Sequence, residues 1–343
     1  MKRVRVILWG LGAMGSGIAK ALLQRSKVEI VGALEVNESL VGKTLSSVIG
    51  EGDCHVVITN DPSAVLKPGV ADIALIATSS FTQVVVPQIE QAVRAGMNVI
   101  TIAEEMAYPM AHNQELACSL DALAKEQGVT ILGTGINPGF VLDTLIIMLT
   151  GVSLDVQAIH AKRVNDLSPF GPMVMRTQGV GTTPEQFEAG IKDGTIVGHV
   201  GFPQSMAMIA DALGWRLDEI VEKKEPIIST VYRKTPYVEI EPGMVAGCRH
   251  IAYGKRNGEV ILTMEHPQQV RPDLAGVETG DYIQITGTPD INLHIKPEIP
   301  GGIGTIAMAV NMIPHVLEAA PGLKTMRDLR LPVAMLPEVM RLC

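Results

Sequence analysis

The sequence predicts an α/β fold, a doubly wound parallel sheet followed by a second α+β domain with a mostly antiparallel sheet. Three observations predict it. A glycine motif separates an apolar strand from a helical pattern at the start of the chain, apolar runs then alternate with helical patterns, and extended runs divided by turns follow. We place the domains at 1–140 and 141–300, and expect the C-terminal helix and tail, 301–343, to pack back on the first domain.

The composition excludes several classes of protein. The chain has 343 residues, enough for two domains, and a net charge of −8 with 3% aromatic residues, which offers no basic or stacking surface for nucleic acid. Its apolar runs are shorter than the roughly 20 residues of a membrane span, and the Arg5 interruption argues against a signal peptide. No C-x-x-C pair occurs among Cys54, Cys118, Cys248 and Cys343, so we expect no metal site, no disulfide and a cytoplasmic location.

The glycine motif lies at the end of the first apolar run, Val4–Trp9, and is formed by Gly10, Leu11, Gly12, Ala13, Met14 and Gly15. In a Rossmann-type domain, the first glycine permits the tight turn, the second admits a pyrophosphate, and the third lets the helix approach the strand. The helix N-terminus then faces the phosphates. We expect a dinucleotide site here; the alternative is a glycine-rich turn without a ligand.

The second strand, Val28–Leu34, ends at Glu35, about 20 residues after the motif, where an acidic side chain typically binds the ribose. Glu35 therefore favours NAD, because the 2′-phosphate of NADP would meet a like charge. Lys43 could offset that repulsion, so NADP is not excluded. The alternative for Glu35 is a solvated side chain at a strand end.

Further strands are expected at 73–77, 98–102 and 129–132, with helices at 84–95 and 114–127. In such sheets the ligand binds at the carboxyl ends of the strands. Three segments therefore become candidates for the site: Ala77, Thr78, Ser79 and Ser80; Glu104 and Glu105; and the loop 133–140 with Asn137.

Glu104 and Glu105 are adjacent carboxylates at a strand end, and like charges held close raise each other's pKa. We expect one to point into the cleft and the other to be solvated or paired; the alternative is that both are ordinary loop acids. Asn137 lies in a glycine loop that permits close approach to a ligand, and a turn role is the alternative.

Extended runs at 156–164, 227–241, 260–265 and 281–286 predict the second sheet, with Asn257-Gly258 as a hairpin turn and Thr288-Pro289-Asp290 as another turn. The last helix carries one apolar face, which we assign to core packing rather than to a partner: Ile303, Ile306, Ala307, Val310, Ile313 and Leu317. Pro314 should kink or interrupt this helix.

Seven motifs spread over nearly the whole chain resemble the 2,4-diaminopentanoate dehydrogenase family: Trp9–Gly17, Ala77–Phe81, Ile100–Met106, Gly133–Phe140, Asn165–Gly171, Gly198–Pro203 and Pro300–Thr305. The wider group is similar to dihydrodipicolinate reductase and meso-diaminopimelate dehydrogenase in its N-terminal domain. Asn137 stands where the latter enzyme has an Asp, which weakens the transfer of an acidic role to this position.

The resemblance implies NAD(P)-dependent oxidative deamination of 2,4-diaminopentanoate at C4, releasing ammonia and 2-amino-4-oxopentanoate. Because the reacting amine must be neutral, we assign Glu104 as the base, with Glu105 as the fallback. From their place after a strand we expect Ala77, Thr78, Ser79 and Ser80 at the cofactor, and from its glycine loop Asn137 at the substrate. The resemblance implies that Arg163, Asn165 and His199 also bind the substrate. From the residues alone, Arg163 and Asn165 could be hairpin-surface residues and His199 a structural histidine.

Two alternatives to this function stay open: an amine dehydrogenase or reductase for another small amino ketone, and a non-catalytic NAD(H)-binding sensor. A homodimer through the second domain's sheet is expected, since homo-oligomers are usually two-fold.

Overall fold

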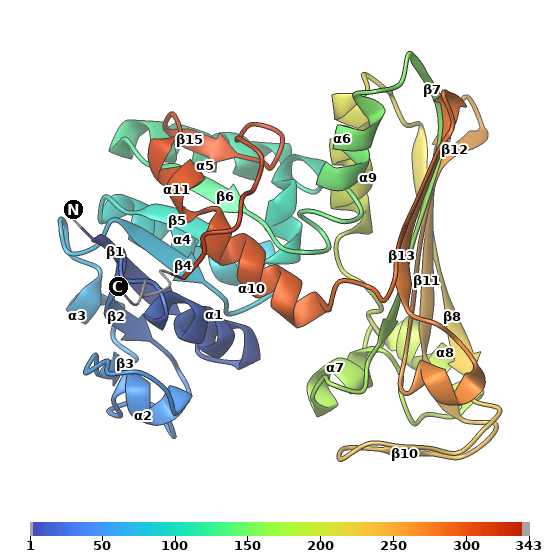
Figure 1. Cartoon of the computed structure of the whole chain (residues 1–343), viewed down its shortest axis with the longest axis horizontal. Coiled ribbons are helices and arrows are strands. Elements are labelled where there is room, and N and C mark those ends of the chain that lie inside the picture. Colours follow the sequence, from blue (N-terminus) through green and yellow to red (C-terminus); the bar gives the residue numbers. More distant parts are fainter. Residues whose placement is uncertain (1–2, 338–343) are drawn as a thin grey trace, which may run out of the picture. The chain divides into compact units, whose positions relative to one another are not determined.

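The computed structural model describes residues 3–337. It contains two compact units, which are described separately. The first holds the described residues up to Phe140 and those from Gly301 onward, and the second is Val141–Pro300 (Figure 1). Within the described residues, no helix is long and apolar enough to cross a membrane, and Cys54, Cys118 and Cys248 are free thiols. Cys343 lies outside the described residues.

The first unit is built on a seven-stranded sheet in which every neighbouring pair is parallel. Its strands lie in this order: β15 (Gly322–Lys324), β6 (Thr130–Gly133), β5 (Asn98–Thr101), β4 (Ile73–Ile76), β1 (Val4–Trp9), β2 (Val28–Leu34) and β3 (Ile58–Thr59). The chain runs outward from β1 through β2 and β3, then starts again at β4 on the other side. The order therefore reverses between β1 and β4, which confirms the Rossmann-type doubly wound sheet.

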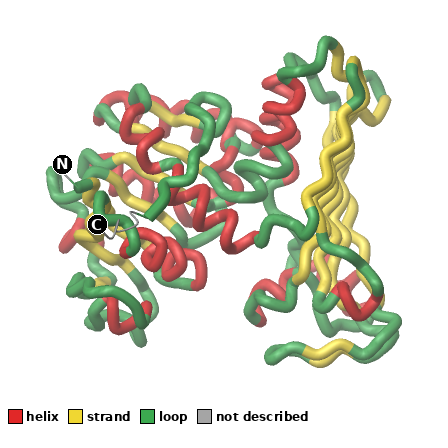
Figure 2. Tube along the Cα trace, viewed as in Figure 1, coloured by secondary structure: helices red, strands yellow, loops and turns green. Residues whose placement is uncertain are grey.

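Helices cover both faces of this sheet, as Figure 2 shows. Because side chains alternate along a strand, Val6 and Leu8 of β1 join one core and Ile7 and Trp9 join the other. The first core includes residues of α1 (Ala13–Leu23), α2 (Leu45–Ile49), α10 (Gly301–Asn311) and α11 (Ile313–Glu318). The second includes residues of α4 (Thr82–Arg94) and α5 (Gln114–Gln127), with Val65 of α3 (Pro62–Val65) packed against it.

The C-terminal helices return to the first unit, as predicted. α10 packs on α1 where Gly17 leaves room, since a Cβ there would lie 2.2 Å from Ile306 Cδ1. The helix ends at Asn311, and Pro314 lies in the first turn of α11, which confirms the expected interruption.

One part of the predicted apolar face is wrong. Val310 and Ile313 are buried, but Ile303 is 68% exposed. The inward position in the first turn of α10 belongs instead to the next residue, Gly304, which packs against Ile136. Successive helical residues differ by about 100°, so Ile303 points away from that contact.

The second unit holds a six-stranded sheet in the order β14 (Ile291–Ile295), β13 (Gly280–Thr288), β7 (Asp155–Asp166), β12 (Glu259–Gln269), β11 (Val245–Arg256) and β8 (Glu219–Ile228). β7 and β12 are parallel, and the other four neighbouring pairs are antiparallel, so the mostly antiparallel sheet is confirmed. Asn257 and Gly258 both have positive φ, 55° and 80°, at the β11–β12 hairpin that their sequence predicts.

The remaining elements of the second unit are short. A two-stranded ladder pairs β9 (Arg233–Lys234) with β10 (Glu239–Ile240). The helices are α6 (Thr144–Thr150), α7 (Pro172–Thr177), α8 (Pro184–Asp193) and α9 (Phe202–Ala212).

Candidate active site

The predicted site segments of the first unit do meet at one edge of the parallel sheet. The first residue after each of β4, β5 and β6 donates a backbone hydrogen bond to the last residue of the neighbouring strand: Ala77 N to Trp9 O at 2.7 Å, Ile102 N to Ile76 O at 3.2 Å, and Thr134 N to Thr101 O at 2.9 Å. The glycine turn, Glu104 and the 133–140 loop thus follow neighbouring strands at their carboxyl ends, where α/β sheets bind ligands.

The three glycines of the turn have different surroundings. Gly10 has φ +95°, and a Cβ there would lie 2.6 Å from Ala77 O; a Cβ on Gly15 would lie 1.8 Å from Gly10 O. No atom of the described residues lies within 4 Å of a Cβ built on Gly12. Gly10 and Gly15 are therefore required by packing, whereas Gly12 faces open space.

Gly12 is also the N-cap of α1, and no described side chain caps this helix. Its first N–H groups, on Ala13 and Met14, lie at the positive end of the helix dipole and suit a phosphate. The turn therefore fits the pyrophosphate of a dinucleotide.

Glu35 is not the solvated strand-end residue of the alternative interpretation. Its Oε2 accepts a hydrogen bond from Leu11 N at 2.6 Å, and its Oε1 accepts from Val36 N at 2.7 Å and Asn37 N at 3.0 Å. The carboxylate is thereby fixed beside the glycine turn, where the ribose of a dinucleotide binds in this fold.

The two adjacent glutamates have separate environments. They begin η1 (Glu104–Ala107), which packs tightly on β6 because Gly133 has no Cβ; one there would lie 2.0 Å from Met106 O. Glu105 Oε2 accepts hydrogen bonds from Thr82 N and Thr82 Oγ1, both at 2.7 Å, at the N-terminus of α4. Glu105 is therefore paired, as expected for one of the two acids.

Glu104 is half-buried and is hydrogen-bonded by the Ser80 hydroxyl. Burial raises the pKa of Glu104, and the Glu105 charge adds to the rise, while the Ser80 hydrogen bond opposes it. A half-buried acid with a raised pKa is the type of group that serves as a base near neutral pH. The two glutamates therefore differ in their surroundings: Glu105 is bound to Thr82, and Glu104 has the raised pKa.

The other predicted residues of this edge have mostly local partners. Thr78 Oγ1 donates to Gln88 Oε1 at 2.6 Å, and Ser79 Oγ accepts from Phe81 N at 3.2 Å. Ala77 contributes its carbonyl beside Gly10. Asn137 is half-buried in a loop that folds back on itself, since a Cβ on Gly139 would lie 2.3 Å from Gly135 N.

In the second unit, Arg163 and Asn165 are 1% and 4% exposed, so the interpretation as hairpin-surface residues is wrong. Arg163 donates from Nη1 to Asp281 Oδ1 and from Nη2 to Ile299 O, each at 2.5 Å. Asn165 Oδ1 is buried and has no hydrogen-bond partner among residues 3–337. A buried acceptor left this way suits a ligand that donates hydrogen bonds.

His199 lies against two histidines that the sequence analysis missed. His199 N donates to His250 Nδ1 at 3.0 Å, and its ring meets the His266 ring edge-on at 4.9 Å between centroids. Burial holds the pKa of His199 and of His266 well below the usual range, so both rings are neutral at neutral pH. Because His250 Nδ1 accepts, its proton is on Nε2, which lies 2.8 Å from Glu222 Oε2.

The register of the second sheet explains this grouping. His250 of β11 is opposite His266 of β12, and Arg163 lies on β7, the other neighbour of β12, opposite Asp281 of β13. The positive charge of Arg163 helps to lower the pKa of both His199 and His266. The Asn257-Gly258 turn was the available signal, because it lies almost midway between His250 and His266 and so predicts their pairing.

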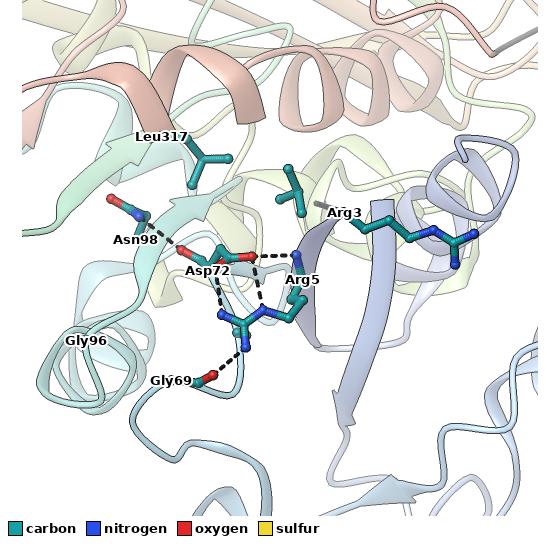
Figure 3. A pocket seen from close by; sticks show the side chains of 9 residues that line it. Arg3, Arg5, Gly69, Asp72, Gly96, Asn98 and Leu317 are labelled. Carbon is teal, nitrogen blue, oxygen red and sulfur yellow. Dashed lines mark hydrogen bonds and ion pairs between the residues drawn. The ribbon is translucent and has the colours of Figure 1, made fainter. Parts of the chain in front are cut away.

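A shallow depression at the opposite edge of the first sheet does not belong to this site (Figure 3). It lies near the amino ends of β1, β4 and β5, where Arg5 Nη2 donates to Asp72 Oδ1 at 2.8 Å. Parallel α/β sheets bind ligands at the other edge. No group of acidic, histidine or cysteine side chains suited to a metal ion occurs within residues 3–337.

Comparison with known proteins supplies the family. Residues 140–343 match the model of the 2,4-diaminopentanoate dehydrogenase C-terminal domain. The chain belongs to the 2,4-diaminopentanoate dehydrogenase family. Residues 4–102 match the N-terminal part of dihydrodipicolinate reductase, the second resemblance seen in the sequence.

Individual relatives agree with this assignment. The chain is 49% identical over 339 residues, 98% of its length and 96% of the relative's, to a 2,4-diaminopentanoate dehydrogenase of Acetoanaerobium sticklandii. It is 25% identical over 354 residues, 96% of each chain, to an amine dehydrogenase of Streptomyces virginiae. The solved amine dehydrogenase of Mycobacterium smegmatis superimposes with a TM-score of 0.85 at 29% identity, over 96% of this chain and 97% of that one.

Family membership confirms the expected class of enzyme, an oxidoreductase of the amine dehydrogenase type. The fold is that of NAD(P)-binding dehydrogenases. GenD2 of gentamicin A biosynthesis, solved in complex with NAD, shares this fold with a TM-score of 0.56 at 15% identity, over 96% of this chain and 90% of that one.

Proposed function

We propose that this member of the 2,4-diaminopentanoate dehydrogenase family oxidises 2,4-diaminopentanoate at C4. With NAD(P)⁺ and water, the reaction yields 2-amino-4-oxopentanoate, ammonia and NAD(P)H. The observation that carries the proposal is the contrast between Glu104, whose pKa is raised, and Glu105, which is bound to Thr82. It leaves one of the two acids available as a base at the ligand-binding edge of the sheet.

Glu104 performs two proton transfers in this proposal. The substrate's C4 ammonium must first lose a proton, because only a neutral nitrogen lone pair can stabilise the positive charge that develops at C4. Glu104 accepts that proton and releases it to solvent; ionised again, it orients and deprotonates the water that attacks the iminium carbon. A bound nicotinamide supplies the hydride acceptor. Collapse of the resulting carbinolamine releases ammonia and leaves the ketone.

The dinucleotide is held by the glycine turn, with its pyrophosphate at the α1 N-terminus beside Gly12 and its ribose at Glu35. The fixed Glu35 carboxylate favours NAD, since a 2′-phosphate would meet its charge. Lys43, which is exposed, is the side chain that we expect to neutralise that charge when NADP is used. We assign Ala77, Thr78 and Ser79 to the cofactor, and Ala77 and Thr78 lie beside Gly10; Ser80 is hydrogen-bonded to Glu104.

We assign recognition of the substrate's polar groups to Arg163, Asn165 and His199, with Asn137 as a further contact. Neutral imidazole and amide oxygen accept hydrogen bonds from an ammonium group, and Arg163 retains N–H groups for a carboxylate beyond the two bonds described. We also propose a homodimer formed through the second unit's sheet, which sedimentation velocity would test.

The proposal is tested by following reduced nicotinamide absorbance with 2,4-diaminopentanoate in one direction and with 2-amino-4-oxopentanoate and ammonia in the other. Turnover in both directions, with NAD⁺ favoured over NADP⁺, is the expected result. Turnover with another amine, and none with 2,4-diaminopentanoate, would show that the assigned substrate is wrong. Cofactor binding without turnover of any amine or ketone would favour a sensor and overturn the proposal.

A further inference from the structure

Gln178, at the C-terminal end of α7, is a buried polar residue that the proposed mechanism does not use. Its side chain is 4% exposed, and Nε2 donates to Gly198 O at 2.8 Å. The opposite amide orientation would place two oxygens against each other, so this hydrogen bond fixes which end of the side chain carries the oxygen. That oxygen, Oε1, is buried and has no hydrogen-bond partner among residues 3–337.

The backbone places Gln178 beside His199. Val197 N and Gly198 N both donate to Thr177 O, at 3.0 and 3.1 Å, so the end of α7 and the 197–199 segment are joined along their backbones. The peptide between Gly198 and His199 is then held from both sides, by Gln178 Nε2 at its carbonyl and by His250 Nδ1 at its N–H. Gln178 is therefore hydrogen-bonded to the peptide of His199, the residue that we assign to substrate binding.

Two buried carbonyl oxygens of this unit, Asn165 Oδ1 and Gln178 Oε1, thus have no protein donor among the described residues. A buried acceptor without a donor is costly, typically about 1–3 kcal/mol, unless a ligand satisfies it. Two carboxylates lie in this region: Asp281 is paired with Arg163, and Glu222 Oε2 lies 2.8 Å from His250 Nε2.

We propose that Gln178 is a specificity-determining residue, whose Oε1 accepts a hydrogen bond from the 2-ammonium group of the substrate. This assignment rests on the proposed function, since it concerns the amine that does not react. It explains how a diamino acid is distinguished from an acid with a single amine at C4, because the analogue would leave Gln178 Oε1 without a donor.

The test compares 2,4-diaminopentanoate with 4-aminopentanoate, which lacks the 2-amino group, in the wild type and in Gln178→Met. We expect the substitution to lower kcat/KM for the diamine by about 10- to 100-fold, mainly through KM, as is typical for loss of a hydrogen bond to a charged group. The value for 4-aminopentanoate should change by less than about 2-fold. Gln204→Met, which replaces another glutamine that is 4% exposed, is the matched control and should not change the ratio between substrates.

Equal losses with both substrates would show that Gln178 only supports the 197–199 segment, and an unchanged diamine value would show that it makes no contact; either result overturns the proposal. If Gln178→Met does not fold, Gln178→Asn, which keeps the amide but shortens it, should show the same selective loss. Failure of the proposed function is recognised separately, because the wild type would then not oxidise the diamine at all.

Discussion

Exchanging each of the two adjacent glutamates for glutamine should separate catalysis from stability. Glu104→Gln keeps the shape of the side chain but removes its ability to accept a proton. General base catalysis typically contributes about 10²–10⁴-fold, so we expect kcat to fall by that factor. The affinity for the dinucleotide should be nearly unchanged, because the glycine turn and Glu35 are intact.

The stability of Glu104→Gln should equal or exceed that of the wild type at neutral pH. The pKa of Glu104 is higher in the folded chain than in the unfolded chain, so the native state loses stability as pH rises through the folded pKa. A neutral glutamine avoids this loss. At a pH below the ordinary pKa range of glutamate, where Glu104 is protonated in both states, the wild type and Glu104→Gln should be similar in stability.

Glu105→Gln should instead lower stability and retain turnover. It removes a charge that accepts two hydrogen bonds at the N-terminus of α4, and interactions of this kind are worth about 0.5–2 kcal/mol. An amide oxygen can replace one acceptor, so we expect a loss near 1 kcal/mol in the free energy of unfolding, with turnover retained. Urea unfolding and initial rates measure the two effects. If Glu105→Gln abolishes turnover while Glu104→Gln retains it, the assigned roles are wrong.

Further substitutions test other parts of the structure. Ser80→Ala removes a hydrogen bond that lowers the pKa of Glu104, so the acidic limb of the kcat/KM profile should move to higher pH; a shift to lower pH would contradict this. Gly12→Ala should fold normally and weaken dinucleotide binding at least about 10-fold, whereas Gly15→Ala should destabilise the fold itself, as fluorescence titration and thermal unfolding would show. Arg163→Met leaves the buried Asp281 unpaired and should cost about 3–5 kcal/mol, measured by urea unfolding, while the Arg163→Met/Asp281→Leu double variant should recover most of that loss.

The parallel sheet was largely predictable because its strands are buried on both faces and so appear as continuous apolar runs. The second sheet was harder. β8 contains Glu222, Lys223 and Lys224 in succession and lacks an apolar run, because its side chains are only partly buried. β15 has only three residues, too few for a recognisable pattern, and it pairs with the edge strand β6.

The site was predictable in position but not in roles. Strand ends identified Glu104 and Glu105, yet the two residues are chemically identical, and only the position of Thr82 on another element distinguishes them. Gln178 lies between Asn165 and His199 in the sequence without a recognisable motif, and His250 follows His199 by 51 residues. Their importance depends on contacts with the 198–199 peptide, which no local pattern reveals.

The first unit is interrupted in sequence by the whole of the second. Its last strand, β15, and the helices α10 and α11 are made only after residue 300, yet Met308, Val310, Ile313 and Val316 cover one face of the sheet. During synthesis, the edge of β6 and one apolar face of the sheet therefore remain exposed. They are covered only after the 160 intervening residues (141–300) have been synthesised. Such delayed, long-range completion favours slow folding and exposure to aggregation. A nascent chain stalled within the inserted unit should accordingly bind chaperones, and release should follow synthesis of β15.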